Sequence, residues 1–255
     1  MTSPRTFKLL LPLLAALAAS CGRPSAPSTS HAANVFGVDD RIAWSAAPGF
    51  PLQSVGKLSM GCTASLVSSR LLLTAAHCLA GFADGTGVSF QPFGANEPQQ
   101  LATILSRGSS ASNPWNAEGS DWAFLLLATP SPYPRIQVWA YGRADDDLVV
   151  GQPAWLMGYS TDLAEASLAR NCAVRDRHDG ALYHDCDLQG GASGGPLFIR
   201  NATGGLMIVG VQSSHAFCNR TACPSGMIYT LPMANRAIDA LSFLAPLQQY
   251  FALYP

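Results

Sequence analysis

Short apolar runs separated by turn-forming residues constrain the fold of this chain more than any other feature. Glycine and proline are frequent, with 23 and 18 residues in a chain of 255. Runs of this length, bounded by Gly, Pro, Asn and Ser, are typical of β-strands joined by tight turns. We therefore expect an all-β fold. The runs are 62–67, 71–75, 101–105, 122–127, 153–157, 196–199, 206–211 and 227–230.

The pattern changes after Met233, where apolar residues recur at helical spacing. This spacing predicts a C-terminal helix, and Pro246 is expected to end it or to start another turn. The apolar residues that carry the spacing are Ile238, Leu241, Phe243, Leu244 and Leu247.

The composition favours a globular protein with little surface charge. Hydrophobic residues make up 48% of the chain and charged residues only 12%, and the formal net charge is −1. Removing the first twenty residues takes away Arg5 and Lys8 and no acidic residue. No basic field is left to attract nucleic acid, so we expect no nucleic-acid partner.

The N-terminus has the features of a targeting segment. Arg5 and Lys8 precede an apolar run, 9–19, that is too short to span a bilayer. Residues 17–21, LAASC, resemble a bacterial lipobox in which Cys21 is lipidated; ordinary secretory cleavage nearby, with Cys21 incidental, is the alternative. We predict a signal peptide at 1–20, a Ser/Pro/Ala-rich tether at 21–34 and a folded domain at 35–255. The protein is then exported, either anchored at the bacterial cell envelope or extracellular.

Three short motifs carry the residue types that nucleophilic catalysis needs. Segment 191–196, GASGGP, sets a serine among glycines, and it follows TAAHC at 74–78 and DWAFLL at 121–126. A serine hydroxyl needs a nearby base, and histidine is suited because its pKa lies near neutrality. Asp121 precedes an apolar run, so its charge would be costly to bury without a hydrogen-bond partner such as an imidazole.

In the order His, Asp, Ser, these motifs resemble the chymotrypsin/trypsin-like serine proteases, and in particular the secreted bacterial branch. Segment 35–41 also resembles the start of the mature domain in glutamyl endopeptidase-type enzymes. The resemblance covers the chain from about residue 35 onward. It implies two antiparallel six-stranded β-barrels with the active site between them. It also implies a triad of His77, Asp121 and Ser193, with the backbone N–H groups of Gly191 and Ser193 as the oxyanion hole.

The cysteines suggest three disulfides in an exported domain. Six remain once Cys21 is set aside, and six cysteines permit 15 pairings. The resemblance pairs Cys62 with Cys78. The other expected bridges are Cys172–Cys186 and Cys218–Cys223, with two separate thiols as the alternative for the last pair. No spacing of Cys and His resembles a zinc site, and we expect neither a metal nor an organic cofactor.

The resemblance also indicates a substrate pocket. Asp187 stands where trypsin-type enzymes carry an aspartate that pairs with arginine or lysine before the cut bond. It could instead belong to the loop alone, because Gln189 replaces the trypsin-type cysteine. Gln212 stands where glutamyl endopeptidases carry a histidine, and small or apolar residues are a further possibility. The expected pocket residues are Asp187, Gln212, Ser213 and His215.

The leading interpretation is a lipid-anchored, exported serine endopeptidase that acts as a monomer on proteins or peptides. The alternatives are a protease-like binding module without catalysis and a hydrolase of small esters. Ala192 replaces the aspartate that precedes the serine in the animal enzymes. Because alanine cannot pair with a freshly cut N-terminal amine, we expect activation not to depend on that ion pair.

Overall fold

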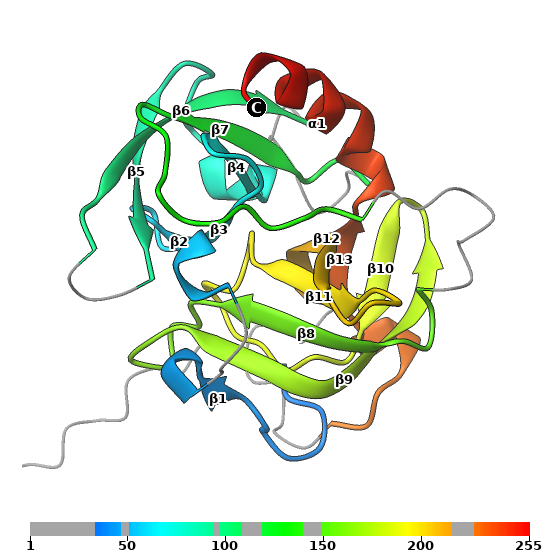
Figure 1. Cartoon of the computed structure of the whole chain (residues 1–255). Coiled ribbons are helices and arrows are strands. Elements are labelled where there is room, and N and C mark those ends of the chain that lie inside the picture. Colours follow the sequence, from blue (N-terminus) through cyan, green and yellow to red (C-terminus); the bar gives the residue numbers. More distant parts are fainter. Residues whose placement is uncertain (1–33, 47–50, 94–96, 109–118, 140–148, 216–226) are drawn as a thin grey trace, which may run out of the picture.

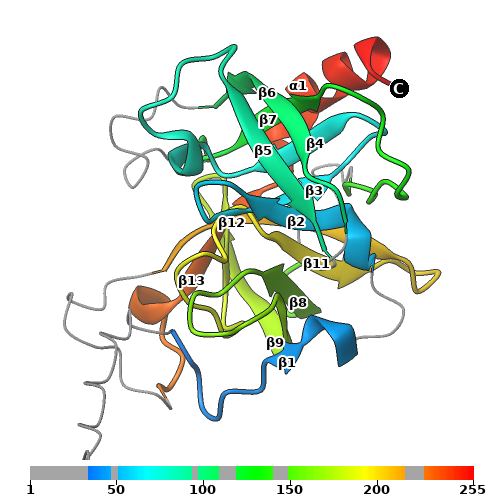
Figure 2. The same cartoon turned by 90° about the vertical axis from the view of Figure 1, so that its left-hand side faces the viewer.

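The computed structural model describes residues 34–46, 51–93, 97–108, 119–139, 149–215 and 227–255. Within these ranges the strands form two closed antiparallel β-barrels of six strands each, which lie side by side (Figures 1 and 2). One α-helix follows the last strand. The all-β fold, the two barrels and the C-terminal helix are therefore confirmed. None of the described helices is long and apolar enough to span a bilayer.

The first barrel has the strand order β2-β3-β4-β7-β6-β5. Buried and more exposed residues alternate along β5, as expected for a strand with one face on the core, whereas every residue of β3 and β4 is buried. Leu72, Phe90 and Leu125 are fully buried in the core of this barrel. The strands are β2 (Val55–Leu58), β3 (Thr63–Leu66), β4 (Leu71–Thr74), β5 (Gly87–Pro92), β6 (Gln100–Arg107) and β7 (Ala123–Leu127).

The second barrel closes because β8 pairs with both β9 and β11. Its remaining order is β9-β10-β13-β12-β11, and the two-residue strand β1 (Ile42–Ala43) adds to the edge of β9. Leu182, Leu197 and Val209 are fully buried in its core. The strands are β8 (Pro153–Gly158), β9 (Ser167–His178), β10 (Ala181–His184), β11 (Pro196–Arg200), β12 (Leu206–His215) and β13 (Asn235–Asp239).

The C-terminal segment contains a strand before its helix. Ile238 belongs to β13 and pairs with Val211, so its place in the predicted helical pattern was wrong. α1 begins at Leu241 and ends at Leu253, and Pro246 lies inside it rather than at its end. The helix continues past the proline. Phe243, before the proline, and Leu247, after it, are both buried. Short 3-10 helices complete the described elements: η1 (Trp44–Ala46), η2 (Leu52–Ser54), η3 (Ala76–Leu79) and η6 (Leu231–Met233).

The first described residues pack against the second barrel. Asn34, the last residue of the expected tether, is fully buried, and its backbone exchanges two hydrogen bonds with Leu188, of 2.9 and 3.0 Å. Its side chain donates to Asn235 Oδ1 at 2.6 Å. Met227, which was expected in a strand, makes only an isolated bridge with Phe36. The N-terminal segment thus lies beside the loop that leads to Ser193.

Candidate active site

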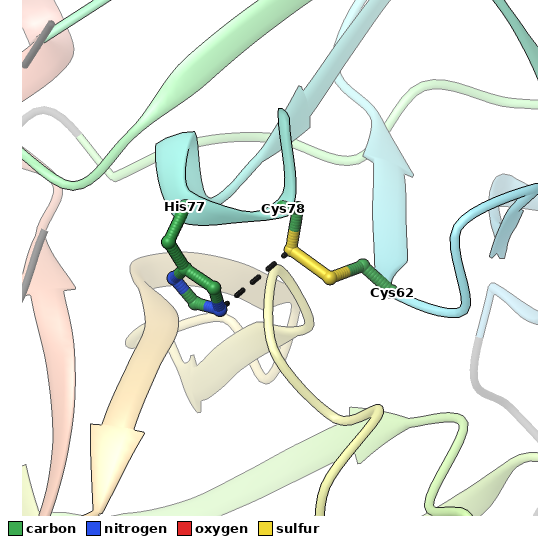
Figure 3. A group of neighbouring side chains, drawn as sticks. All are labelled: Cys62, His77 and Cys78. Atoms are coloured by element: carbon green, nitrogen blue, oxygen red, sulfur yellow. Dashed lines mark hydrogen bonds between the residues drawn. A yellow bond between two sulfur atoms is a disulfide. The ribbon is translucent and has the colours of Figure 1, made fainter. Parts of the chain in front are cut away.

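His77 lies in η3, directly after β4 ends. The disulfide between Cys62 and Cys78 ties this short helix to the residue before β3 (Figure 3). Ligand atoms of Cys62, His77 and Cys78 lie within 4.8 Å of one another, which is close enough for a metal site. Both sulfur atoms are bonded to each other, however, so they are not thiolates. The cluster is therefore a disulfide packed beside a histidine, with His77 Nε2 3.8 Å from Cys78 Sγ.

Asp121 precedes β7, and its side chain is only 1% exposed. It accepts three hydrogen bonds: from the His77 backbone N–H at 2.8 Å, from His77 Nδ1 at 2.8 Å and from the Ser213 hydroxyl at 2.5 Å. A carboxylate so deeply buried is tolerated when donors surround it. In neutral His77 the ring proton therefore lies on Nδ1, and Nε2 is the basic nitrogen.

Ser193 lies in a tight loop between β10 and β11, and a Cβ on any of the three glycines of its GASGGP motif would clash with neighbouring backbone. Gly191 has a φ of +95°, and a Cβ on it would lie 2.1 Å from the Tyr159 carbonyl oxygen. Gly194 has a φ of +80°, and a Cβ there would lie 2.1 Å from the Thr63 carbonyl oxygen. Positive φ and close backbone approach both favour glycine, which explains the composition of the motif.

Thr63, at the start of β3, joins the first barrel to this loop, and the sequence analysis did not identify it. Its backbone N–H donates to Ser193 O at 2.8 Å. Its hydroxyl donates to Gly191 O at 2.9 Å and accepts from the Tyr159 N–H at 3.0 Å. The position next to Cys62 was the only local signal, because nothing in the sequence indicates a contact between residues so far apart.

A cavity of about 140 Å³ lies beside Ser193. Its walls are formed by residues 188–190 and 212–214 together with Ser193. Gln212 and Ser213, two of the expected pocket residues, are therefore brought together with the serine. The backbone of Gln212 also bonds the loop, since Gly194 N donates to Gln212 O at 2.7 Å and Gln212 N donates to Gly195 O at 2.8 Å. His215 ends β12, and its side chain lies outside the described part of the structure.

Asp187 is engaged with the N-terminal segment. Its carboxylate accepts hydrogen bonds from the backbone N–H of Phe36 at 2.8 Å and of Asp40 at 3.2 Å, and it is not among the described residues that line the cavity. Burial raises the pKa of Asp187 to about 6, and the carboxylates of Asp40 and Asp39 act in the same direction. The two backbone N–H groups oppose the shift by stabilising the ionised form.

His184 is a second residue whose role the sequence did not indicate. It ends β10 and is fully buried. Its Nε2 lies 2.8 Å from Gln212 Oε1. Burial lowers the pKa of His184 to about 4, so the ring is neutral at physiological pH.

Two of the expected disulfides are present. Cys62 bonds Cys78, and Cys172 bonds Cys186, so both pairings are confirmed. The expected pair Cys218–Cys223 and the lipidation candidate Cys21 lie outside the described residues.

The comparisons with known proteins concern the family and the fold. Residues 45–237 match the trypsin family. Serine protease 23 of Bos taurus is 25% identical over 220 residues, which cover 75% of this chain but only 57% of that protein. A trypsin-like protease of Streptomyces glaucescens is 27% identical over 222 residues, covering 80% of this chain and 81% of that protein. The crystal structure of Rv3671c protease in its inactive form has the same fold, with 18% identity, a TM-score of 0.52 and coverage of 78% of this chain and 89% of that one. The chain belongs to the trypsin family of serine proteases.

Proposed function

We propose that the protein is a serine endopeptidase that cleaves peptide bonds through an acyl-enzyme. The observation that carries the proposal is the set of three hydrogen bonds on Asp121, two of them from His77, beside a glycine-constrained loop that holds Ser193. Ser193 is the nucleophile, His77 the general base and Asp121 the residue that orients the imidazole.

The proposed reaction uses each of these atoms in turn. Ser193 Oγ attacks the substrate carbonyl carbon while His77 Nε2 takes its proton. The tetrahedral intermediate then expels the amine, which receives the proton from His77, and the acyl group remains on Ser193. Water attacks the ester by the same route, releases the acid and restores the serine.

The N–H groups of Gly191 and Ser193 are the proposed oxyanion donors. Thr161 N donates to the Gly190 carbonyl oxygen at 2.8 Å. Because the carbonyl and N–H of a trans peptide point in opposite directions, this bond directs the Gly191 N–H away from Thr161. The bond from Thr63 to the Ser193 carbonyl likewise fixes the backbone on the other side of the serine. Donors held in place before reaction stabilise the developing charge without reorganisation.

The side-chain preference at the cut bond depends on Asp187 and Gln212. A preference for arginine or lysine, as expected from the sequence, requires the Asp187 carboxylate to reach the bound side chain. That carboxylate instead accepts hydrogen bonds from Phe36 and Asp40, and the described walls of the cavity carry no charged residue. This geometry favours an uncharged side chain, and Gln212 is one of the polar residues in the described walls.

Activation without a free N-terminal amine is supported by Asn34. Its nitrogen is a peptide N–H linked to residue 33, and it already pairs with Leu188 in the uncut chain. Ala192 is 2% exposed and packs closely against Gly158, where an added Cβ would lie 2.9 Å from Ala192 Cβ. We expect removal of residues 1–33 to leave activity unchanged; a strict need for that cleavage would contradict the proposal.

The cellular location remains a proposal drawn from the N-terminus. A signal peptide at 1–20, lipidation at Cys21 and a tether to residue 34 would place the domain at the cell envelope or outside the cell. The disulfides Cys62–Cys78 and Cys172–Cys186 are compatible with an exported protein. Metabolic labelling with a clickable fatty acid tests the anchor, since Cys21→Ala should abolish the label.

A serine-directed fluorophosphonate tests the catalytic proposal. We expect wild-type protein to be labelled and Ser193→Ala to remain unlabelled with an unchanged melting temperature. Ser59→Ala, an exposed serine after β2, is the matched control and should be labelled like the wild type. A folded wild-type protein that takes no label would instead indicate a binding module. Labelling with hydrolysis of small esters but of no peptide would indicate an esterase.

A further inference from the structure

The cavity beside Ser193 is bounded by a chain of hydrogen bonds with a fixed direction. Cys186 N donates to His184 Nδ1 at 3.3 Å, His184 Nε2 contacts Gln212 Oε1 at 2.8 Å, and Gln212 Nε2 donates to Ser214 O at 3.0 Å. This series of hydrogen bonds runs from the end of β10, in the second barrel, to the wall of the cavity.

Backbone groups at both ends determine where every proton lies. The Cys186 N–H can only donate, so His184 Nδ1 must be the acceptor and Nε2 must carry the proton. The Ser214 carbonyl can only accept, so the Gln212 nitrogen must face it and the Gln212 oxygen must face His184. No alternative orientation of the Gln212 amide satisfies both ends.

His184 can hold this arrangement because it stays neutral. It is fully buried, and the burial lowers its pKa to about 4, although the nearby Asp185 carboxylate acts in the opposite direction. Protonation would place a hydrogen on Nδ1, facing the Cys186 N–H. The orientation of Gln212 is therefore stable at neutral pH.

The fixed amide leaves one donor for a substrate. A glutamine amide has two N–H groups, and Ser214 O is the acceptor of only one of them. Gln212 lines the cavity beside Ser193, and the described walls contribute no charged side chain. The volume of about 140 Å³ is far more than a single water requires, and it suits a side chain of several atoms.

We propose that Gln212, held by His184, donates its second amide N–H to a neutral oxygen acceptor on the substrate side chain before the cut bond, so that the pocket selects glutamine. This inference rests on the proposed function for the position of the cut bond. Glutamine fits because its carbonyl oxygen accepts the N–H without bringing a charge into a pocket that has no described cation. His184 is a positioning residue, since it acts through Gln212.

Binding to the inactive Ser193→Ala protein tests the pocket independently of catalysis. The probes are acetylated peptides that mimic the acid product and differ only in their last residue: glutamine, glutamate, methionine or arginine. We expect the glutamine peptide to bind at least about tenfold more tightly than the methionine peptide, as one added hydrogen bond in a desolvated site provides. Equal binding of these two peptides, or tightest binding of the glutamate or arginine peptide, would overturn the proposal.

Variants in the Ser193→Ala background assign the selectivity to the two residues. Gln212→Met should abolish the preference for glutamine over methionine, whereas Gln152→Met, on an exposed turn, should keep it. His184→Leu should reduce the preference because the amide is then free to turn. In His184→Gln, the new amide can accept a hydrogen bond from the Cys186 N–H and donate one to Gln212 Oε1. This variant should therefore show the preference for glutamine again. Retained preference in Gln212→Met, or lost preference in a folded His184→Gln protein, would contradict the inference.

The two proposals fail in different ways. If wild-type protein takes no fluorophosphonate label but the Ser193→Ala protein still prefers the glutamine peptide, the pocket stands and catalysis does not. If the wild-type protein takes the label but the Ser193→Ala protein does not prefer the glutamine peptide, the serine protease proposal stands and the pocket inference is wrong.

Discussion

At the scale of single residues, Asp121 determines the geometry of the site. Its carboxylate accepts from both the backbone and the ring of His77 and from Ser213, so it connects the two barrels. The three donors leave the carboxylate satisfied although it is buried. A change at this position therefore acts through the orientation and protonation of His77 rather than through packing.

Asp121→Asn tests this role. The asparagine amide would place an N–H₂ group toward His77 Nδ1 and favour the tautomer in which Nε2 carries the proton. We expect kcat/KM to fall on the order of 10⁴-fold. Steady-state kinetics measures the loss, and Asp84→Asn, at an exposed ion pair with Arg107, is the control that should keep activity. Activity within tenfold of wild type would contradict the role.

Asp187 makes stability depend on pH. Its pKa is raised to about 6 in the folded protein from an ordinary value near 3.8, chiefly by burial. Because the pKa of Asp187 is higher in the folded protein than in the unfolded one, this residue contributes its full stabilisation at pH values below the unfolded pKa. The contribution is lost as pH rises from about 4 through 6. Asp187→Asn removes the titration. Urea unfolding between pH 4 and pH 8 should show the variant gaining stability relative to wild type as pH rises, and a constant difference would rule out the raised pKa.

At the scale of elements, the loop between β10 and β11 holds Ser193 by backbone contacts rather than by side chains. Ala192 N donates to Gln189 O at 3.2 Å and Gly195 N donates to Ala192 O at 2.9 Å, which closes two consecutive turns. Glycines with positive φ allow these turns, and the neighbouring backbone leaves no space for a Cβ at either. The loop is therefore sensitive to substitutions that add only one methyl group.

Gly191→Ala separates strain from steric clash when it is compared with Gly85→Ala. Gly85 has a φ of +85° but no atom within 4 Å of an added Cβ, whereas the Cβ at Gly191 would lie 2.1 Å from Tyr159 O. We expect Gly85→Ala to cost about 1–2 kcal/mol of unfolding free energy and to keep activity. Gly191→Ala should cost more and abolish fluorophosphonate labelling. Similar effects at the two positions would contradict the requirement for close approach.

At the scale of the whole molecule, the site exists only because the two barrels are held in one arrangement. His77 and Asp121 come from the first barrel, and Ser193 and Ser213 come from the second. The helix α1, which follows the last strand of the second barrel, lies against the first barrel (Figures 1 and 2). The rings of Phe124 in β7 and Phe243 in α1 have centroids 6.3 Å apart. Thr63 provides a second connection at the loop that holds Ser193.

Thr63→Val tests the coupling between the barrels. Valine matches the shape of threonine but removes the hydroxyl that bonds Gly191 O and Tyr159 N. We expect kcat to fall between about tenfold and a hundredfold through misplacement of the loop. The unfolding free energy should fall by about 1–3 kcal/mol, because polar backbone groups lose their partner. Thr103→Val, on β6 of the same barrel, is the control, and equal kcat in the two variants would contradict the coupling.

The elements that could be predicted from sequence are those with local signals. β4 and β7 are continuous apolar runs, and they lie close to where the pattern placed them. β9 was not predicted as a strand, because its 12 residues include several charged ones and form no continuous apolar run. Met227 is apolar but forms only an isolated bridge, since its partner is the distant Phe36. Hydrophobic periodicity indicates that one face of a segment is buried, but it does not indicate which other segment of the chain pairs with it.

The sequence by itself indicated the proposed chemistry: a histidine, an aspartate and a serine in the order of one family, and glycines around Ser193. These signals are local, because residue type and backbone freedom are properties of short segments. Only the tertiary structure decided that Asp187 bonds the N-terminal segment, that Thr63 holds the loop, and that His184 orients Gln212 at the cavity. Each of these contacts joins residues distant in the chain, and hydrogen-bond direction and burial arise only when folding brings such residues together.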